Sequence, residues 1–261
     1  MWPGSVLLRS FTKPPWPLLL AVAALGLLLS YISKGHAVLP DFCGAVVGML
    51  PYSRWPDALD AAFALNSSLR VLTDWALMIV AMMPPLLAMP LMHIWRSSLS
   101  RNRLGVSAAF VATYWGVWMA MGGILTAFSL TLRIALGEGA LAGATMLALL
   151  WSATPLHRAA LNRGHRVRRI SLFGWRAHRD GLTFGVLHGL WCVASCWAWM
   201  VVPLVAGVWH IPLMVLAGVV MLTERLSLPG PPRWRWPLVV SIVTRPAFSL
   251  LAAGGSGRNH G

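Results

Sequence analysis

Charged residues are scarce in this 261-residue chain, at 11% of all positions, and only seven of them are acidic. Soluble globular domains carry a charge at roughly a quarter of their positions, so this scarcity excludes an ordinary soluble domain. Hydrophobic residues make up 57% of the chain, which also contains 15 tryptophans and has a mean hydropathy of +0.68. We therefore predict an integral membrane protein.

The chain also lacks the residues of a disulfide framework and of the common catalytic sites. Its three cysteines are Cys43, Cys192 and Cys196, too few for such a framework. There is no acidic pair within an apolar run, no glycine-rich phosphate loop, and no nucleophile beside an acid-supported base. Only His188 lies clearly within an apolar run, whereas bis-histidine haem needs two facing histidines. Conventional catalysis is not indicated, and haem is disfavoured.

Apolar runs that qualify, or nearly qualify, as membrane-spanning helices of about 20 residues occur six times. They lie at about 17–32, 74–95, 105–130, 139–156, 182–205 and 209–223. We predict an all-α, polytopic membrane helical bundle of about six transmembrane helices, forming a single domain over residues 1–230. Residues 231–261 are expected to form a partly disordered tail. Pro84 and Pro85 lie inside the second run and predict a kink there.

The net charge of +14 is concentrated in a few connections between apolar runs. Basic and near-neutral connections alternate along the chain, as the positive-inside rule requires of a membrane protein. This alternation predicts both termini in the cytoplasm and a bacterial inner-membrane location, and it disfavours nucleic acid as a partner. The most basic connection, residues 157–181, is expected to be a solvated loop that touches lipid headgroups.

His188, Cys192 and Cys196 lie four residues apart within the apolar stretch FGVLHGLWCVASCWAWM, residues 184–200. Because each residue turns a helix by about 100°, a four-residue step returns nearly to the same face, and the three side chains form one stripe. Three glycines fall on the same stripe: Gly181, Gly185 and Gly189. Small residues at this spacing let a second helix approach closely, so we expect the stripe to face protein instead of lipid.

Two interpretations of this stripe remain open. In the first, glycine and cysteine are simply small side chains, and His188 donates to a carbonyl group. In the second, the thiols and the imidazole bind a metal, because polar groups are costly in hydrocarbon unless something binds them. Thiolates and thioethers suit Cu(I), whereas thiolates with imidazole suit zinc, and copper is the metal that we favour.

The predicted metal site adds methionines to the stripe. Its residues are His188, Cys192 and Cys196 as ligands, with Met82, Met83 and Met200 as auxiliary thioethers. Counting about 1.5 Å per residue places Met82, Met83 and Met146 at nearly the depth of Cys196. Methionine is also a common filler of gaps between membrane helices, so packing is the alternative role for each of them.

Four stretches resemble a bacterial family of predicted metal-binding integral membrane proteins, a domain of unknown function. They are WALMIVAMMPPLLAMP, TPLHRAAL, GVLHGLWCVASCWAWM and LTERL, and the resemblance covers roughly residues 70–225. It implies a membrane fold and a metal, with the matched candidate ligands His188, Cys192, Cys196, Met78, Met82 and Met83. This chain has Ser195 where members often have a further cysteine.

These observations predict an inner-membrane protein that binds or handles a soft metal ion, copper before zinc. The lipid bilayer is its expected surrounding, and a membrane oxidase or a metal-handling complex is the kind of partner that such a protein would serve. The alternative is a structural or accessory subunit of a larger membrane complex, without a metal of its own. In that case the tryptophans and the glycine stripe would be packing and docking surfaces.

Overall fold

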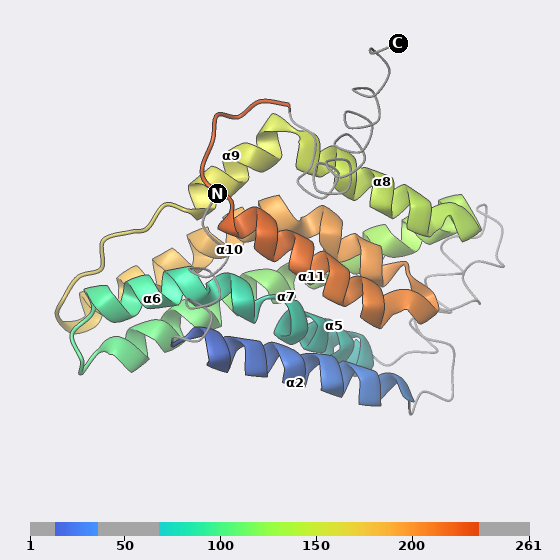
Figure 1. Cartoon of the computed structure of the whole chain (residues 1–261). Coiled ribbons are helices and arrows are strands. Elements are labelled where there is room, and N and C mark those ends of the chain that lie inside the picture. Colours follow the sequence, from blue (N-terminus) through green and yellow to red (C-terminus); the bar gives the residue numbers. More distant parts are fainter. Residues whose placement is uncertain (1–13, 36–67, 235–261) are drawn as a thin grey trace, which may run out of the picture.

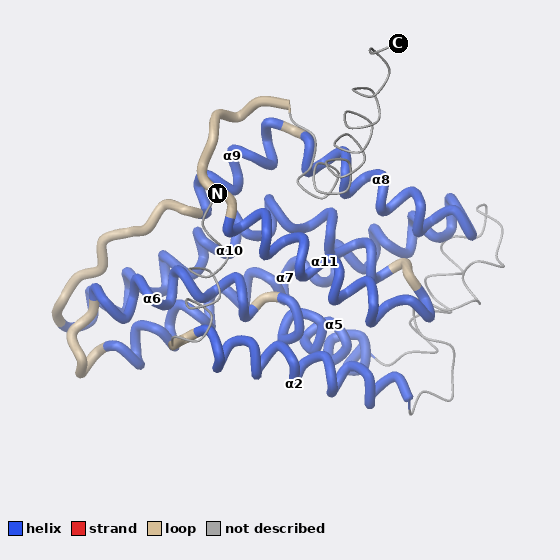
Figure 2. The backbone as a smooth tube through the Cα atoms, in the orientation of Figure 1, coloured by secondary structure: helices blue, strands red, loops and turns tan. Residues whose placement is uncertain are grey.

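A computed structural model describes residues 14–35 and 68–234 of the chain, and within them every regular element is a helix (Figures 1 and 2). The predicted all-α class is confirmed to that extent. The helices of the first half are α2 (Trp16–Gly35), α5 (Ser68–Met82), η2 (Pro84–Leu87), α6 (Ala88–Ser97) and α7 (Arg103–Leu136). They are followed by η3 (Gly137–Gly139), α8 (Ala140–Ala153), α9 (Pro155–Gly164), α10 (Gly174–Leu204), η4 (Gly207–Trp209) and α11 (His210–Leu226). Cys43 and most of the predicted tail lie outside the described residues.

Helix α10 is the centre of the bundle. In its most apolar window 67% of the residues are buried, against 28% in the corresponding window of α2. It packs most extensively against α7 and also contacts α8, α9 and α11, while α2 packs mainly on α5 (Figure 1). Two indoles tie α8 to α10: Trp151 Nε1 donates to Ala194 O at 3.1 Å, and Trp199 Nε1 donates to Ser152 Oγ at 2.9 Å.

Four helical stretches of the described chain are long and apolar enough to cross a membrane, or up to five if the bent α5–α6 pair counts as one span. One of the four, Arg103–Ala153, contains the connection at η3, where the chain doubles back (Figure 1). Gly137 ends α7 there with a φ of 52°, a left-handed conformation that glycine adopts without steric cost. The expected number of about six spans stays a prediction.

The kink expected at Pro84 and Pro85 is confirmed. Helix α5 ends at Met82, and the helices on either side of the break are bent by 53°. Neither proline has an N–H to continue the helical hydrogen bonds, and the chain passes through the short 3₁₀ helix η2 before α6 begins. The break places Met83 at the inner corner of the bend, where its side chain is fully buried.

The connection between the fourth and fifth predicted spans differs from the expected loop. Helix α8 has only 14 residues, about 21 Å of helix, and Pro155 starts the new helix α9 with Thr154 as its N-cap. Helix α10 then begins at Gly174, well before the predicted 182. The prediction of a solvated loop over 157–181 is therefore wrong for most of its length. The many arginines of this segment led to the prediction of a loop, although α9 is an amphipathic helix that buries Ala160 and Leu161.

Candidate metal centre

The glycine stripe of α10 positions the candidate site by bringing the backbone of α7 close. A Cβ atom on Gly181 would come within 2.9 Å of Val106 O, and one on Gly189 within 3.1 Å of Val117 Cβ. A Cβ atom on Gly185 would collide with Phe110 O and Thr113 Oγ1. The expectation that this stripe faces protein is confirmed. One turn further along α10, Cys192 is consequently held against the fully buried aromatic side chains of α7.

Three sulfur atoms converge around one tyrosine in this core. Cys192 Sγ and Cys196 Sγ are 3.9 Å apart, and both thiols are free and buried. Tyr114 Oη is 3.2 Å from Cys192 Sγ and 3.4 Å from Met83 Sδ. A thioether can only accept a hydrogen bond, so Tyr114 donates to Met83 and the Cys192 thiol donates to Tyr114. Helices α7 and α10 and the break after α5 thus meet at a buried group of two thiols and one thioether.

Further side chains border the two thiols. Ser195 Oγ donates to Cys192 O at 3.0 Å and lies 3.5 Å from Cys196 Sγ. Trp118, fully buried in the same core, has an indole N–H without a hydrogen-bond partner among the described residues. Its backbone oxygen accepts from Trp75 Nε1 at 2.9 Å, which fixes α5 against α7. Buried aromatic side chains of α7, Tyr114 and Trp118, therefore lie beside the sulfur atoms.

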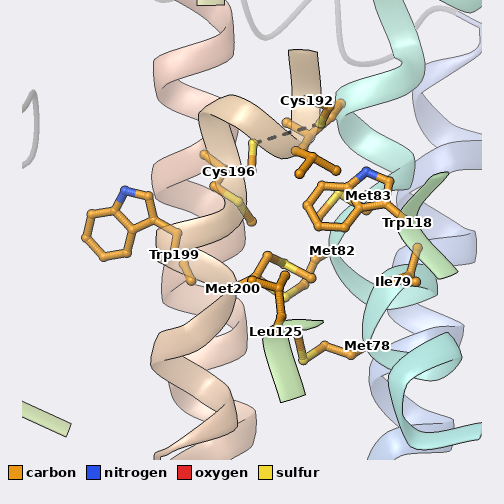
Figure 3. Packing of buried hydrophobic residues seen from close by; sticks show 14 of the residues in the cluster. Met78, Ile79, Met82, Met83, Trp118, Leu125, Cys192, Cys196, Trp199 and Met200 are labelled. Atoms are coloured by element: carbon orange, nitrogen blue, oxygen red, sulfur yellow. Dashed lines mark hydrogen bonds between the residues drawn. The ribbon is translucent and has the colours of Figure 1, made fainter. Parts of the chain in front are cut away.

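The other candidate methionines divide into two groups. Met82 and Met200 are buried in the same core and extend toward each other from α5 and α10, further along the bundle than the cysteine pair (Figure 3). Met78 lies beside them (Figure 3). Met146, expected at the depth of Cys196, is 61% exposed and faces away from the core. Its depth in the helix was not enough to bring it to the site.

His188 is buried on α10 but is occupied by a different partner. Its Nε2 lies 3.4 Å from Nη2 of Arg225, and a guanidinium can only donate, so this nitrogen accepts the hydrogen bond. The rings of Phe110, Tyr114 and Phe184 surround it, with ring centroids at 5.8, 6.0 and 5.7 Å. Among residues 14–35 and 68–234, no three His, Cys, Asp or Glu side chains are grouped to hold one metal ion. His188, Cys192 and Cys196 therefore share a helix face without forming a ready-made three-ligand site.

The donor set that does assemble suits a soft monovalent cation. Thiolate and thioether sulfur select Cu(I), whereas carboxylate, carbonyl and water select hard divalent ions. In the described part of the chain no carboxylate or histidine joins the two cysteines in a group of three that could hold a metal, and His188 Nε2 is occupied by Arg225. Cys192, Cys196 and Met83 are thus the residues that could hold copper. Met82 and Met200 lie further along the same core and are additional thioether candidates.

Tyr114 is the residue of this site that the sequence analysis missed. A signal for it was present, because Phe110, Tyr114 and Trp118 recur every four residues along α7. That spacing matches the spacing of the stripe on α10, and all three side chains are fully buried. A tyrosine hydroxyl in the middle of an apolar stripe requires a hydrogen-bond partner, and here the partners are sulfur atoms.

The chain matches the model of a known protein family. The model, described as PpoB2, a copper chaperone, matches residues 72–246, which is more than half of the chain and includes most of α5 and all of α7 and α10. No curated protein and no solved structure matches the chain. The match agrees with the metal-related family expected from the sequence and with the soft donor set around Tyr114. The chain belongs to the PpoB2 copper chaperone family.

Proposed function

We propose that this protein is a membrane-embedded copper chaperone that binds Cu(I) through Cys192, Cys196 and Met83. The observation that carries the proposal is the meeting of two free thiols and one thioether at Tyr114, at separations of 3.2–3.9 Å from one another or from its hydroxyl. Membership of a copper chaperone family supports the same metal. The copper ion is the cargo of the protein, to be received and passed on.

The arrangement suggests how the chain would receive the ion. Thiol ligands lose their protons when they bind a metal, so the Cys192 thiol would cease to donate to Tyr114. The tyrosine hydroxyl could then turn its own hydrogen bond from Met83 to the new thiolate and release the thioether as a ligand. Tyr114 would in this way stop donating to Met83 and donate to the Cys192 thiolate instead, by rotation of its hydroxyl group alone.

The methionine assignment can be tested with a matched pair of variants. Met83→Leu nearly conserves volume, so the fold should persist, but Cu(I) affinity is expected to fall on the order of ten-fold. Met146→Leu removes an exposed thioether of the same helix bundle and should leave the affinity unchanged. Both would be measured anaerobically on purified full-length protein by competition with a Cu(I) chelator. Equal affinities for the two variants and the wild type would remove Met83 from the site.

We further propose that the chain lies in a bacterial inner membrane with both termini in the cytoplasm. The α6–α7 and α9–α10 connections lie at one end of the bundle, and the η3 and α10–α11 connections lie at the other (Figure 1). The first end is arginine-rich: Arg101, Arg103, Arg166, Arg168 and Arg169. The second end has Glu138 in its turn. This asymmetry is the one expected of cytoplasmic and external ends.

Labelling of intact cells tests this orientation. A single new cysteine would be introduced by Glu138→Cys or by Arg169→Cys, and the cells would be treated with a membrane-impermeant maleimide. We expect labelling of the Glu138→Cys protein in intact cells, and of the Arg169→Cys protein only after the cells are opened. The parent chain, treated in the same way, controls for the native cysteines. The reverse pattern would invert the proposed topology.

A further inference from the structure

A cavity of about 540 Å³ lies at the arginine-rich end of the bundle, apart from the sulfur atoms. It is bounded by residues of α6 and α9, by the first half of α10 and by the last turn of α11 with the residues that follow it. Its polar lining consists mainly of basic groups: Arg96, Arg225, His93, His165 and His188. Among the described residues, no aspartate or glutamate lines it.

Arg225 is the unusual member of this lining. It is only 7% exposed, and among the described residues its Nη1 has no hydrogen-bond partner while its Nη2 donates to Nε2 of His188. The neighbouring carboxylate does not face it, because Glu224 Oε2 lies 3.4 Å from His157 Nε2 instead. A buried guanidinium without a carboxylate is costly unless an anion compensates it. The cavity is the space from which such an anion could reach it.

A second cavity, of about 270 Å³, shares Phe184 and His188 with the first one and strengthens the positive field. It is lined by Arg163, Arg166 and Arg168, and no acidic residue of the described part of the chain lines it. The guanidinium of Arg163 lies over the ring of Trp191, with its central carbon 4.6 Å from the ring centroid. Guanidinium groups thus gather on both sides of His188, and a free cation would be repelled from this end of the bundle.

The rest of the lining of the first cavity is mostly apolar, and this indicates what kind of anion the cavity would bind. Met89 and Leu228 are 56% and 71% exposed and continue the lining toward the outer surface of the bundle. A ligand that fills this shape carries a negative group at one end and an apolar body at the other. Basic pockets between membrane helices on the cytoplasmic side accept lipid headgroups of this kind.

We propose that Arg225 binds a phosphate group in this cavity, supplied by the headgroup of an anionic phospholipid. The guanidinium lines the cavity and offers an N–H to a phosphate oxygen, a charge-assisted hydrogen bond of the stronger kind. The acyl chains leave past Met89 and Leu228 toward the membrane. The site rests on the membrane location proposed above and is independent of copper.

Native mass spectrometry of the detergent-purified full-length protein tests the site. The probes are phosphatidylglycerol and phosphatidylcholine with the same acyl chains, each titrated separately. We expect one molecule of phosphatidylglycerol to bind about ten-fold more tightly than phosphatidylcholine, and Arg225→Gln to abolish the difference. Arg169→Gln, which removes an exposed arginine outside both cavities, should leave the preference intact.

A second variant keeps the test decisive if Arg225→Gln impairs folding. A Cβ atom on Gly164 would collide with Nη1 of Arg225, so Gly164→Ala displaces the guanidinium and retains its charge. Like Arg225→Gln, this variant should reduce the preference for phosphatidylglycerol over phosphatidylcholine. An equal preference in the wild type and in both cavity variants would overturn the proposal, as would the lack of any preference in the wild type.

Inorganic phosphate distinguishes the two sources of the anion. In one outcome, millimolar phosphate displaces the lipid from the wild type, and phosphate alone binds as tightly as the lipid does and only when Arg225 is present. The site then belongs to a free phosphate, and the lipid assignment is wrong. If phosphate does not compete, the headgroup assignment is supported. The Cys192→Ser/Cys196→Ser protein should retain the lipid preference, which separates a failure of this site from a failure of the copper site.

Discussion

Replacing Cys192 and Cys196 together by serine is expected to abolish stoichiometric Cu(I) binding. Changes to residues that merely support a ligand already cost 10–100-fold in metal affinity, so the loss of both thiolates should weaken binding by more than about 100-fold. Serine is close to cysteine in size, but its hydroxyl is a hard ligand that Cu(I) does not favour. The measurement is the copper content of anaerobically purified, copper-loaded protein, determined by mass spectrometry.

Cys43→Ser is the matched control for the double variant. Cys43 lies outside the matched residues 72–246, and its replacement removes one thiol while Cys192 and Cys196 keep theirs. We expect its copper content to equal that of the wild type. If the wild type binds no copper, or if the double variant binds as much as the wild type, the copper site is refuted. The accessory-subunit interpretation would then account better for the same packed residues.

Helical arithmetic predicted the stripe on α10 well but could not say what each member of it would face. A four-residue step turns about 40° beyond a full turn at each repeat, so His188 and Cys196 diverge by about 80° around the helix. Cys192 consequently contacts the hydroxyl of Tyr114 and has Cys196 beside it, whereas His188 Nε2 accepts from Arg225 of α11. Which neighbour lies at which rotation depends on the packing of the whole bundle, and a single helix does not contain that information.

The methionines also show that position along a single helix does not reveal which neighbour a side chain will face. Length along a helix predicts depth, and depth placed Met83 and Met146 at nearly the same level as Cys196. Rotation about the helix axis separates them, because Met83 is fully buried at the bend after α5 while Met146 is 61% exposed on α8. The hydrophobicity of α8 does not distinguish its sides, but small residues recur every four positions on its buried side: Ala140, Ala144, Ala148 and Ser152. The count of depth did not use this spacing.

Charged residues that pair over long distances in the chain were the least predictable part. Glu224 and His157 are both buried and lie 3.4 Å apart, although they belong to α11 and α9. The pairing turns the acidic partner away from Arg225 and leaves that guanidinium facing the cavity. Sequence showed Glu224 and Arg225 only as neighbours at the end of a span. Their opposite orientations follow from the fold of α9 against α10, which the sequence analysis had interpreted as a solvated loop.

Gly185→Ala is expected to destabilise the protein, although alanine normally favours a helix. The added methyl group would collide with Phe110 O, a backbone atom that moves only if α7 itself moves. Thr113 Oγ1, which donates to Leu182 O at 3.1 Å, would be displaced as well. Overpacking of this kind costs about 1–3 kcal/mol, and it should lower the midpoint of thermal unfolding of the purified protein in detergent.

Gly116→Ala provides the opposite expectation on the same pair of helices. A Cβ atom at Gly116 of α7 meets no atom within 4 Å, so the substitution should leave stability unchanged or raise it by up to about 1 kcal/mol through helix propensity. The two variants therefore differ in the sign of their effect, which a general intolerance of these helices to mutation would not produce. Separation of α10 from α7 would also draw Cys192 away from Tyr114. Gly185→Ala should accordingly weaken Cu(I) binding, whereas Gly116→Ala should not, and equal behaviour of the two would show that close approach of these helices does not build the sulfur site.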